Sequence, residues 1–212
     1  MNTVCDLPGA SLSPDLSGFP DPQIDLAVDP SLNSAELVLA GGCFWCTEAV
    51  YRQLDGVLDV VSGYAGGSAE TANYKDVCSG ATDHAEAIAI RYQPAKISFG
   101  QLLKVFLSAA HDPTQLNRQG NDQGRQYRSA IFYADDEQRD VASAYLDQLE
   151  DEAAFSSPVV TTLERLTTFY PAEAYHQDYA ARNPAQPYIA GVSAPKVAKV
   201  RKLYPSRLKP AG

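Results

Sequence analysis

Residues 36–54, ELVLAGGCFWCTEAVYRQL, carry the clearest structural pattern in the sequence. Its first five residues form a short apolar run whose length and branching favour a buried strand over a helix. Gly41 and Gly42 then supply a turn, and from Cys43 onward the apolar side chains recur at helical spacing. This stretch therefore predicts a strand, a tight glycine turn and a helix that begins at Cys43.

Short strands and amphipathic helices alternate through the rest of the chain. Further strands are predicted at residues 57–64, 86–92, 129–133 and 158–163. Helices are predicted from the capping box Ser98-x-x-Gln101 to His111, from Asp135 or Asp136 onward, and at residues 171–181. The order strand, helix, strand, strand, helix, strand is the split βαβ pattern of a ferredoxin-like α+β domain. We therefore expect a two-layer sandwich with irregular N- and C-terminal extensions.

Charge divides the 212 residues into three parts that sum to a net charge of −9. Residues 1–51 contain seven acids and no Lys or Arg, residues 52–178 contain 19 acids and 10 bases, and residues 179–212 contain seven bases and no acid. The first 33 residues also hold five prolines and no periodic apolar pattern, which is typical of an arm. We expect an acidic arm at 1–33, a catalytic domain at 34–188 and a basic tail at 189–212.

Composition also excludes several classes of protein. The first basic residue is Arg52, so no N-terminal targeting segment is expected. No apolar run approaches the roughly 18 residues of a membrane-spanning helix. Phosphate contacts need clustered Lys and Arg, which are absent before the last few turns, so nucleic acid is not an expected partner. We expect a monomeric cytoplasmic protein with reduced cysteines.

Cys43 is the first candidate for chemistry. At the start of a helix, free N–H groups and the macrodipole favour a negative charge and thus a thiolate. The preceding glycines leave room for a substrate to approach the sulfur. The alternative is a small buried hydrophobic residue, which many cysteines are.

Cys46 follows three residues later, a spacing that brings two cysteines within disulfide range at a helix start. A structural zinc needs four ligands, and Cys5, Cys78 and three isolated histidines form no second pair. His84-Ala-Glu86 matches half of a zinc-deaminase signature, but the rest of that signature is missing. We therefore expect no metal, with a zinc-stabilised module as the weaker alternative.

Glu86 is the only acid on an otherwise apolar strand face, where burial would raise its pKa and make it a proton donor. The alternative is an edge-strand carboxylate in water, the commoner fate of glutamate. Tyr74, Asp122 and Tyr127 lie in two long loops, where tyrosine hydroxyls can polarise an oxygen. Most tyrosines only pack, so the residues alone leave this role open.

Several blocks of sequence occur in the order found in one enzyme family. They are Gly42-Cys43-Phe44-Trp45 with Glu48, Gly63-Tyr-Ala-Gly-Gly67, Asn73-Tyr74, His84-Ala-Glu86, His111-Asp-Pro113, Asp122 to Tyr127 and Tyr175-His-Gln177. Together they resemble peptide methionine sulfoxide reductase of the A type, from about Glu36 to Tyr188. Such enzymes repair oxidised methionine, one enzyme for each sulfoxide epimer.

This resemblance implies a role for each candidate residue. Cys43 would attack the sulfur of a methionine S-sulfoxide, free or in a protein, and become a sulfenic acid. Phe44 and Trp45 would form an apolar wall that receives the methyl group of the substrate. Glu86 would protonate the sulfoxide oxygen, and Tyr74 and Tyr127 would donate hydrogen bonds to it. Asp122 would help to organise substrate and water. A sulfoxide oxygen leaves poorly until protonated, so this reaction needs a thiolate beside a neutral acid.

The sequence departs from the family in how the enzyme is recycled. Many members use a cysteine in the C-terminal tail, but none follows Tyr188 here. Cys46 is therefore the expected resolving thiol, with Cys5 and Cys78 as alternatives, and thioredoxin would reduce a Cys43–Cys46 disulfide without any further cofactor. The main rival is a thioredoxin-type disulfide oxidoreductase, which explains the two cysteines but not Glu86 or the tyrosines.

Overall fold

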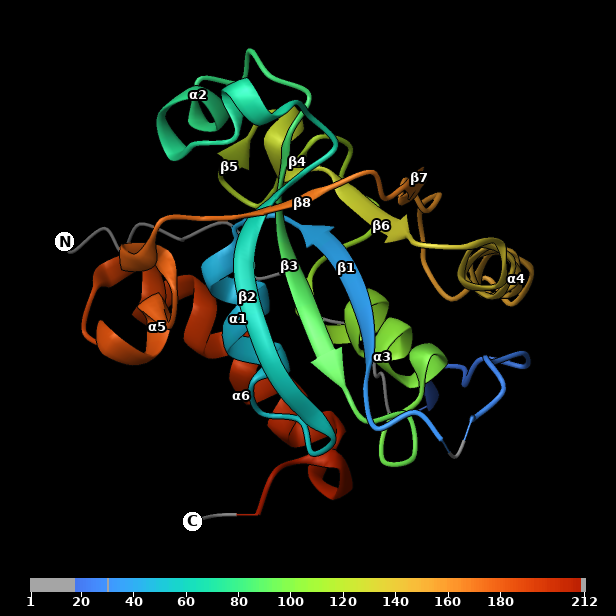
Figure 1. Ribbon diagram of the computed structural model, residues 1–212. Coiled ribbons are helices and arrows are strands. Elements are labelled where there is room, and N and C mark those ends of the chain that lie inside the picture. Colours follow the sequence, from blue (N-terminus) through green and yellow to red (C-terminus); the bar gives the residue numbers. More distant parts are fainter. Residues whose placement is uncertain (1–17, 30, 211–212) are drawn as a thin grey trace, which may run out of the picture.

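A computed structural model describes residues 18–29 and 31–210, and its centre is a six-stranded mixed sheet (Figure 1). The strand order is β7-β6-β1-β3-β2-β8. The bounds are β1 Ala35–Gly41, β2 Val57–Ala65, β3 Ala85–Tyr92, β6 Ser129–Tyr133, β7 Thr162–Arg165 and β8 Phe169–Pro171. A small separate hairpin pairs β4 (Arg118–Gln119) with β5 (Asp122–Gln123).

The helices are α1 Phe44–Tyr51, α2 Tyr74–Cys78, α3 Phe99–Val105, α4 Asp136–Asp151, α5 Tyr179–Arg182 and α6 Ala194–Leu203. Among them, α1 packs on the sheet and α6 packs on α1, so α1 lies between the sheet and the C-terminal helix. None of the helices in the described part of the chain has the length and apolarity needed to cross a membrane.

The predicted strand, helix, strand, strand, helix, strand order is present, and β3 lies between β1 and β2. β1 pairs antiparallel with both β3 and β6, and β6 pairs parallel with β7. The mixed α+β class is therefore confirmed. The strand predicted at 158–163 is β7, which begins later, at Thr162, and pairs at one edge of the sheet, whereas β8 at the other edge was not expected.

Alternating side chains of the central strands build two apolar layers. Leu37 and Leu39 of β1 join the main core under α1 and α3, whereas Val38 and Ala40 face the opposite side. That second layer consists largely of alanines and is covered by Leu166 and Phe169. The strand that leads to Cys43 is thus buried on both faces, which fixes its register and the position of its end.

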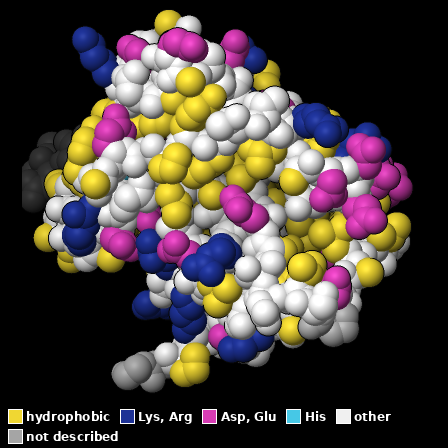
Figure 2. Space-filling model, viewed as in Figure 1, with side chains coloured by type: hydrophobic (Ala, Val, Ile, Leu, Met, Phe, Trp, Pro, Cys, Tyr) yellow, Lys and Arg dark blue, Asp and Glu magenta, His cyan; other side chains and the backbone are white. Residues whose placement is uncertain are grey.

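The predicted caps are confirmed. Ser98 and Gln101 form a reciprocal capping box at α3, and the Asp135 side chain accepts the Gln138 N–H at the start of α4. Figure 2 shows acidic side chains gathered over α4, with Lys and Arg toward the C-terminal end of the chain.

Two expectations for the last third of the chain are wrong. Residues 171–181 do not form one helix: β8 ends at Pro171, and Asp178 takes a left-handed conformation (φ 54°) that separates two short turns. The basic tail is not irregular either, because α6 packs on α1 and buries Val200 completely. Its apolar residues Val197, Val200 and Leu203 recur at helical spacing, a pattern that the many basic side chains obscure.

The described part of the N-terminal arm lies along α3 and α4. Lys104 Nζ is 2.7 Å from a carboxylate oxygen of Asp21, and the Gly100 N–H donates to Asp25. The Tyr145 hydroxyl donates to the Pro20 carbonyl at 2.8 Å. Residues 1–17, with Cys5, lie outside the described residues.

Candidate active site

Cys43 caps α1 directly after the end of β1. Gly42 makes the turn with φ 84°, and a Cβ atom there would lie 2.5 Å from Cγ of Gln119. Only glycine meets both demands, the positive φ and the close approach of a side chain. The glycine turn predicted from the sequence therefore positions the sulfur at the C-terminal end of the central strand β1.

Glu86 lies on β3, the strand beside β1, and is only 2% exposed. One of its carboxyl oxygens accepts the N–H of Phe44 at 3.1 Å, and among the described residues it forms no ion pair. Burial raises the pKa of Glu86 to about 8, while the Phe44 hydrogen bond acts in the opposite direction. Glu86 is therefore a neutral acid at pH 7, as the apolar strand face predicted.

The Cys43 thiol differs from the expectation. Its pKa is raised well above the usual value, first by burial and then by hydrogen bonding to Cys46 and the nearby Glu86. The first N–H of α1 points at the carboxyl of Glu86 instead of the sulfur. The N–H at the start of the helix therefore hydrogen-bonds to the carboxyl oxygen of Glu86 and does not stabilise a thiolate, so Cys43 is a neutral thiol.

Cys46 is the more acidic thiol of the pair. A hydrogen bond from Cys43 is the largest influence, and it lowers the pKa of Cys46 to about 7 against the opposing effect of burial. Lys196, Tyr188 and Ser193 lower this pKa further. The two coupled thiols therefore titrate as a pair, in which the negative charge is favoured on Cys46.

A cavity of about 220 Å³ collects the candidate residues of the sequence. It is lined by Cys43, Phe44, Trp45, Tyr74, Glu86, Asp122, Tyr127, Gln186 and Tyr188. Cys46 is absent from this lining and is fully buried. Burial raises the pKa values of Tyr74 and Tyr127 above the usual range, so both hydroxyls stay protonated and can donate.

Tyr188 is a residue of the site that the sequence reasoning missed. Its hydroxyl donates to the carboxylate of Asp122 and lies 3.8 Å from Sγ of Cys46. It comes from the start of the C-terminal segment, for which the sequence predicts no element. No local pattern could have identified it, because it meets Asp122 across 66 residues.

The indole of Trp45 is fixed from two sides. Its Nε1–H donates to Nδ1 of His176 at 3.2 Å, and its ring stacks on Tyr179 with centroids 3.9 Å apart. Both partners belong to the segment after β8. The apolar wall of the cavity is therefore built jointly by α1 and this segment.

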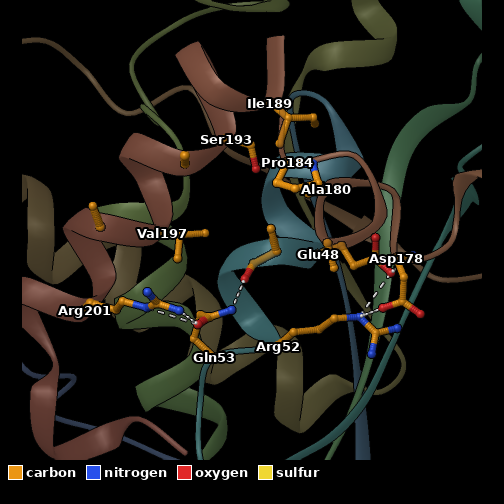
Figure 3. Close-up of a pocket in the computed structure, with 14 residues that line it drawn as sticks. Glu48, Arg52, Gln53, Asp178, Ala180, Pro184, Ile189, Ser193, Val197 and Arg201 are labelled. Atoms are coloured by element: carbon orange, nitrogen blue, oxygen red, sulfur yellow. Dashed lines mark hydrogen bonds and ion pairs between the residues drawn. The ribbon is translucent and has the colours of Figure 1, made fainter. Parts of the chain in front are cut away.

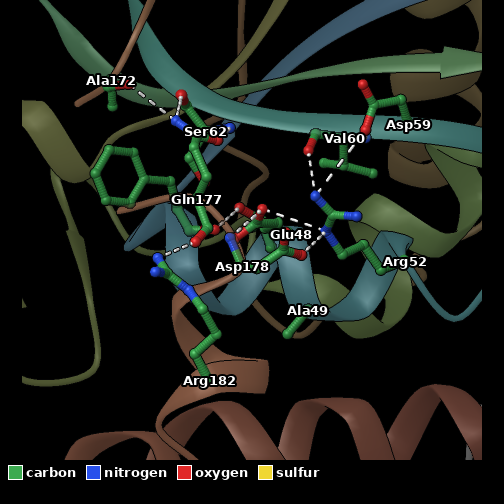
Figure 4. A network of polar contacts seen from close by, with 12 residues as sticks. Glu48, Ala49, Arg52, Asp59, Val60, Ser62, Ala172, Gln177, Asp178 and Arg182 are labelled. Carbon is green, nitrogen blue, oxygen red and sulfur yellow. Dashed lines mark hydrogen bonds and ion pairs between the residues drawn. The ribbon is translucent and has the colours of Figure 1, made fainter. Parts of the chain in front are cut away.

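A polar network holds the segment after β8 against α1 (Figure 4). The buried carboxylate of Glu48 accepts from Arg52 at 3.3 Å and from the N–H of Asp178 at 3.0 Å. Gln177 exchanges two hydrogen bonds with the backbone of Ser62 on β2, each 2.9 Å long. This network fixes the two residues that follow His176, and hence helps to position the indole.

A second cavity, of about 380 Å³, lies between α1, α5 and α6 (Figure 3). Its wall is mostly apolar, with Ile189, Ser193 and Val197 on one side and Arg52 and Arg201 at one end. None of the sequence-predicted site residues lines it. In residues 18–29 and 31–210 no cluster of three His, Cys, Asp or Glu side chains has the arrangement of a metal site.

These features define a class of protein, a cysteine-based oxidoreductase in which a buried neutral acid and tyrosine hydroxyls share a cavity with a thiol. The chain belongs to the peptide methionine sulfoxide reductase family, whose model matches residues 35–208. The family predicted from the sequence motifs, and with it the class of oxidoreductase, is confirmed.

Relatives match over most of the chain. Peptide methionine sulfoxide reductase MsrA 2 of Synechocystis sp. is 52% identical over 200 residues, which cover 93% of this chain and 94% of the relative. MsrA of Deinococcus radiodurans is 48% identical over 85% of this chain and 87% of its own. Among solved structures, reduced Mxr1 of Saccharomyces cerevisiae has a TM-score of 0.67 at 36% identity, covering 76% of this chain and 91% of its own.

Proposed function

We propose that this chain reduces the S epimer of methionine sulfoxide, free or in proteins, and thereby repairs oxidised methionine. The observation that supports this most is a neutral carboxyl, Glu86, in the same small cavity as the Cys43 thiol. A sulfoxide oxygen has to be protonated before it leaves, and an ionised carboxylate cannot supply that proton. Family membership supports the same reaction.

The cavity has one wall for each end of the sulfoxide group. Phe44 and Trp45 provide an apolar surface for the methyl group, with the indole held by His176. The hydroxyls of Tyr74 and Tyr127, both protonated, donate to the oxygen. Asp122, hydrogen-bonded by Tyr188, is left to orient the substrate backbone or a water molecule.

The chemical step transfers one oxygen atom to Cys43. The sulfur of Cys43 attacks the sulfoxide sulfur while Glu86 gives its proton to the oxygen, and the thiol proton of Cys43 replaces the one that Glu86 has lost. The hydroxyl group then passes from the methionine sulfur to the Cys43 sulfur: a new S–O bond forms on Cys43, while the old S–O bond and the transient bond between the two sulfurs break. The products are methionine and the sulfenic acid of Cys43, with atoms and charge balanced.

Recycling uses Cys46 in our proposal. Its thiolate attacks the sulfur of the sulfenic acid, the S–O bond breaks, and the departing oxygen takes a proton from Glu86 and leaves as water, which gives a Cys43–Cys46 disulfide. The low pKa of Cys46 and its hydrogen bond with Cys43 support this choice. Cys78 is only half-buried and lines neither cavity described above, and its pKa is raised, first by burial, so it is the weaker candidate.

The remaining parts of the proposal rest on composition and fold. We propose thioredoxin as the source of electrons, no metal or organic cofactor, a cytoplasmic location and a monomeric state. The central strands in the order β6-β1-β3-β2 support a ferredoxin-like description of the core. We also propose the division predicted from the sequence, with an N-terminal arm at 1–33, a catalytic domain at 34–188 and a basic C-terminal segment at 189–212.

The test is stereoselective turnover. NADPH consumption is followed with thioredoxin and its reductase, using the S and R epimers of a methionine sulfoxide substrate in separate reactions. We expect turnover with the S epimer only, and equal rates or none would refute the proposal. For recycling, mass spectrometry of wild type and Cys46→Ser after one turnover should find the Cys43 disulfide only in the wild type.

A further inference from the structure

The two sulfurs of the proposed disulfide differ in access. Cys43 is 8% exposed and lines the 220 Å³ cavity. Cys46 has no exposed surface and lines neither this cavity nor the 380 Å³ cavity on the flank of α1. A thiolate that approaches from solvent through the substrate cavity therefore meets Cys43 first.

The direction of approach also suits Cys43. Thiol–disulfide exchange proceeds by attack of a thiolate on one sulfur while the other leaves. Such a displacement is in line, so the attacking sulfur must come from the side opposite the leaving sulfur. Cys43 lines the cavity and Cys46 does not, so an attacking sulfur in the cavity can reach Cys43 and finds no open route to the fully buried Cys46.

The surroundings of Cys46 fit a leaving thiolate. The Tyr188 hydroxyl lies 3.8 Å from Sγ of Cys46, and its proton, now directed at Asp122, can turn to the sulfur. The Ser193 hydroxyl is buried and forms no hydrogen bond with the described residues, yet it lies close enough to Cys46 to lower the pKa of that thiol. Figure 3 shows Ser193 in the wall of the flanking cavity. Buried hydroxyls normally have a hydrogen-bond partner, so the Ser193 hydroxyl is a donor that is available to a thiolate on Cys46.

The positive charge of Lys196 also favours a thiolate on Cys46. Lys196 lies one turn after Ser193, at the start of α6, and both lower the pKa of the Cys46 thiol. A thiol of low pKa leaves a disulfide faster than one of ordinary pKa. Segments that the sequence analysis expected to be an irregular tail thus supply two groups to the resolving cysteine.

We propose that the reductant attacks Cys43, and that Cys46, although it resolves the sulfenic acid, is the leaving group, stabilised by Tyr188, Ser193 and Lys196. This inference rests on the proposed Cys43–Cys46 disulfide. In the step, the thiolate of a dithiol reductant forms a bond to Cys43, the Cys43–Cys46 bond breaks, and its electron pair stays on Cys46. The second thiol of the reductant then attacks the mixed disulfide and releases Cys43, so the reductant is oxidised and the enzyme returns to two thiols.

The first experiment traps the mixed disulfide. The enzyme is oxidised by one turnover without reductant, and mass spectrometry verifies the Cys43–Cys46 disulfide. A thioredoxin whose second active-site cysteine is replaced by serine is then added, free thiols are alkylated at early times, and the adduct is mapped. We expect thioredoxin on Cys43 and an alkylated Cys46, whereas thioredoxin on Cys46 would overturn the inference. Absence of the initial disulfide would instead refute the proposed recycling.

The second experiment tests whether Ser193 and Lys196 stabilise the leaving thiolate of Cys46. Reduction of the preformed disulfide by dithiothreitol is followed through the fluorescence of Trp45, the only tryptophan. Ser193→Ala and Lys196→Met should each slow this step by about 3- to 10-fold. Lys202→Met, an exposed charge on the same helix, is the control and should leave it unchanged. The yield of methionine in a single oxidative turnover should be unaffected in all three, and variants no slower than the control would refute the role.

Discussion

Two glutamates, Glu86 on β3 and Glu48 on α1, are almost equally buried, at 2% and 1% exposure, yet their environments differ in kind. Glu48 accepts hydrogen bonds from Arg52 and from the N–H of Asp178. Glu86 accepts a single N–H, from Phe44. Burial raises the pKa of both, but in Glu48 the Asp178 N–H and the Arg52 charge oppose it, whereas the pKa of Glu86 reaches about 8.

The difference shows that partners, and not depth, separate a structural carboxylate from a chemical acid. Glu48 holds the segment that positions Trp45, and Glu86 holds a proton. A buried ionised group without compensation is costly, so Glu86 stays neutral and is free to give its proton to a substrate.

The largest expected effect comes from removing the proton of Glu86. Glu86→Gln keeps the shape of the neutral acid and can still accept the Phe44 N–H, but it cannot transfer a proton. We expect turnover to fall by roughly 100-fold or more. The rate of sulfoxide reduction is measured alongside the number of titratable thiols, which should not change. Wild-type turnover in this variant would remove Glu86 from the mechanism.

The same substitution should change how stability depends on pH. Because the folded pKa of Glu86 is raised, the folded protein holds a proton that the unfolded chain releases above about pH 4.5. The stability linked to this proton is complete below that pH and is lost as pH rises toward 8. Urea unfolding at pH 5 and 8 should show wild type losing up to about 4 kcal/mol relative to Glu86→Gln. Parallel pH profiles would mean that Glu86 is ionised in the fold.

Removing the cation from Glu48 tests the other half of the comparison. Arg52→Met leaves a buried carboxylate with only the Asp178 N–H, and we expect the free energy of unfolding to fall by about 2 kcal/mol. The double variant Glu48→Gln/Arg52→Met should recover part of this loss, because no charge is then buried. Urea titration of the four proteins gives the cycle, and a double variant less stable than Arg52→Met would contradict this account.

Sequence reasoning found the parts of the site that follow from local pattern. The strand, glycine turn and helix around Cys43 follow from short-range periodicity, and Glu86 stands out as the one acid on an apolar strand face. It missed Tyr188, and it quoted His176 within the block Tyr175-His-Gln177 without giving it a role, because these residues reach the site through contacts across 66 and 131 residues. The sequence also predicted a thiolate at Cys43, because a helix start offers free N–H groups to a nearby negative charge. In the structure the Phe44 N–H is taken by Glu86, which lies 42 residues away and is not part of any local pattern.

The smallest expected effect concerns Asp178, whose left-handed backbone costs stability while its side chain contributes an ion pair. Its N–H compensates Glu48, its carboxylate is 2.8 Å from Arg52, and its φ of 54° is unfavourable for a residue with a side chain. Asp178→Gly keeps the N–H and relieves the backbone by up to about 1 kcal/mol, but it loses a half-exposed ion pair of similar or smaller value. Thermal and urea unfolding should therefore place this variant within about 1 kcal/mol of wild type. A larger loss of stability would mean that the Asp178 carboxylate is needed to hold Arg52 beside Glu48. Glu48 would then be stabilised by a charged triad, and not by one cation and one N–H as the comparison with Glu86 assumes.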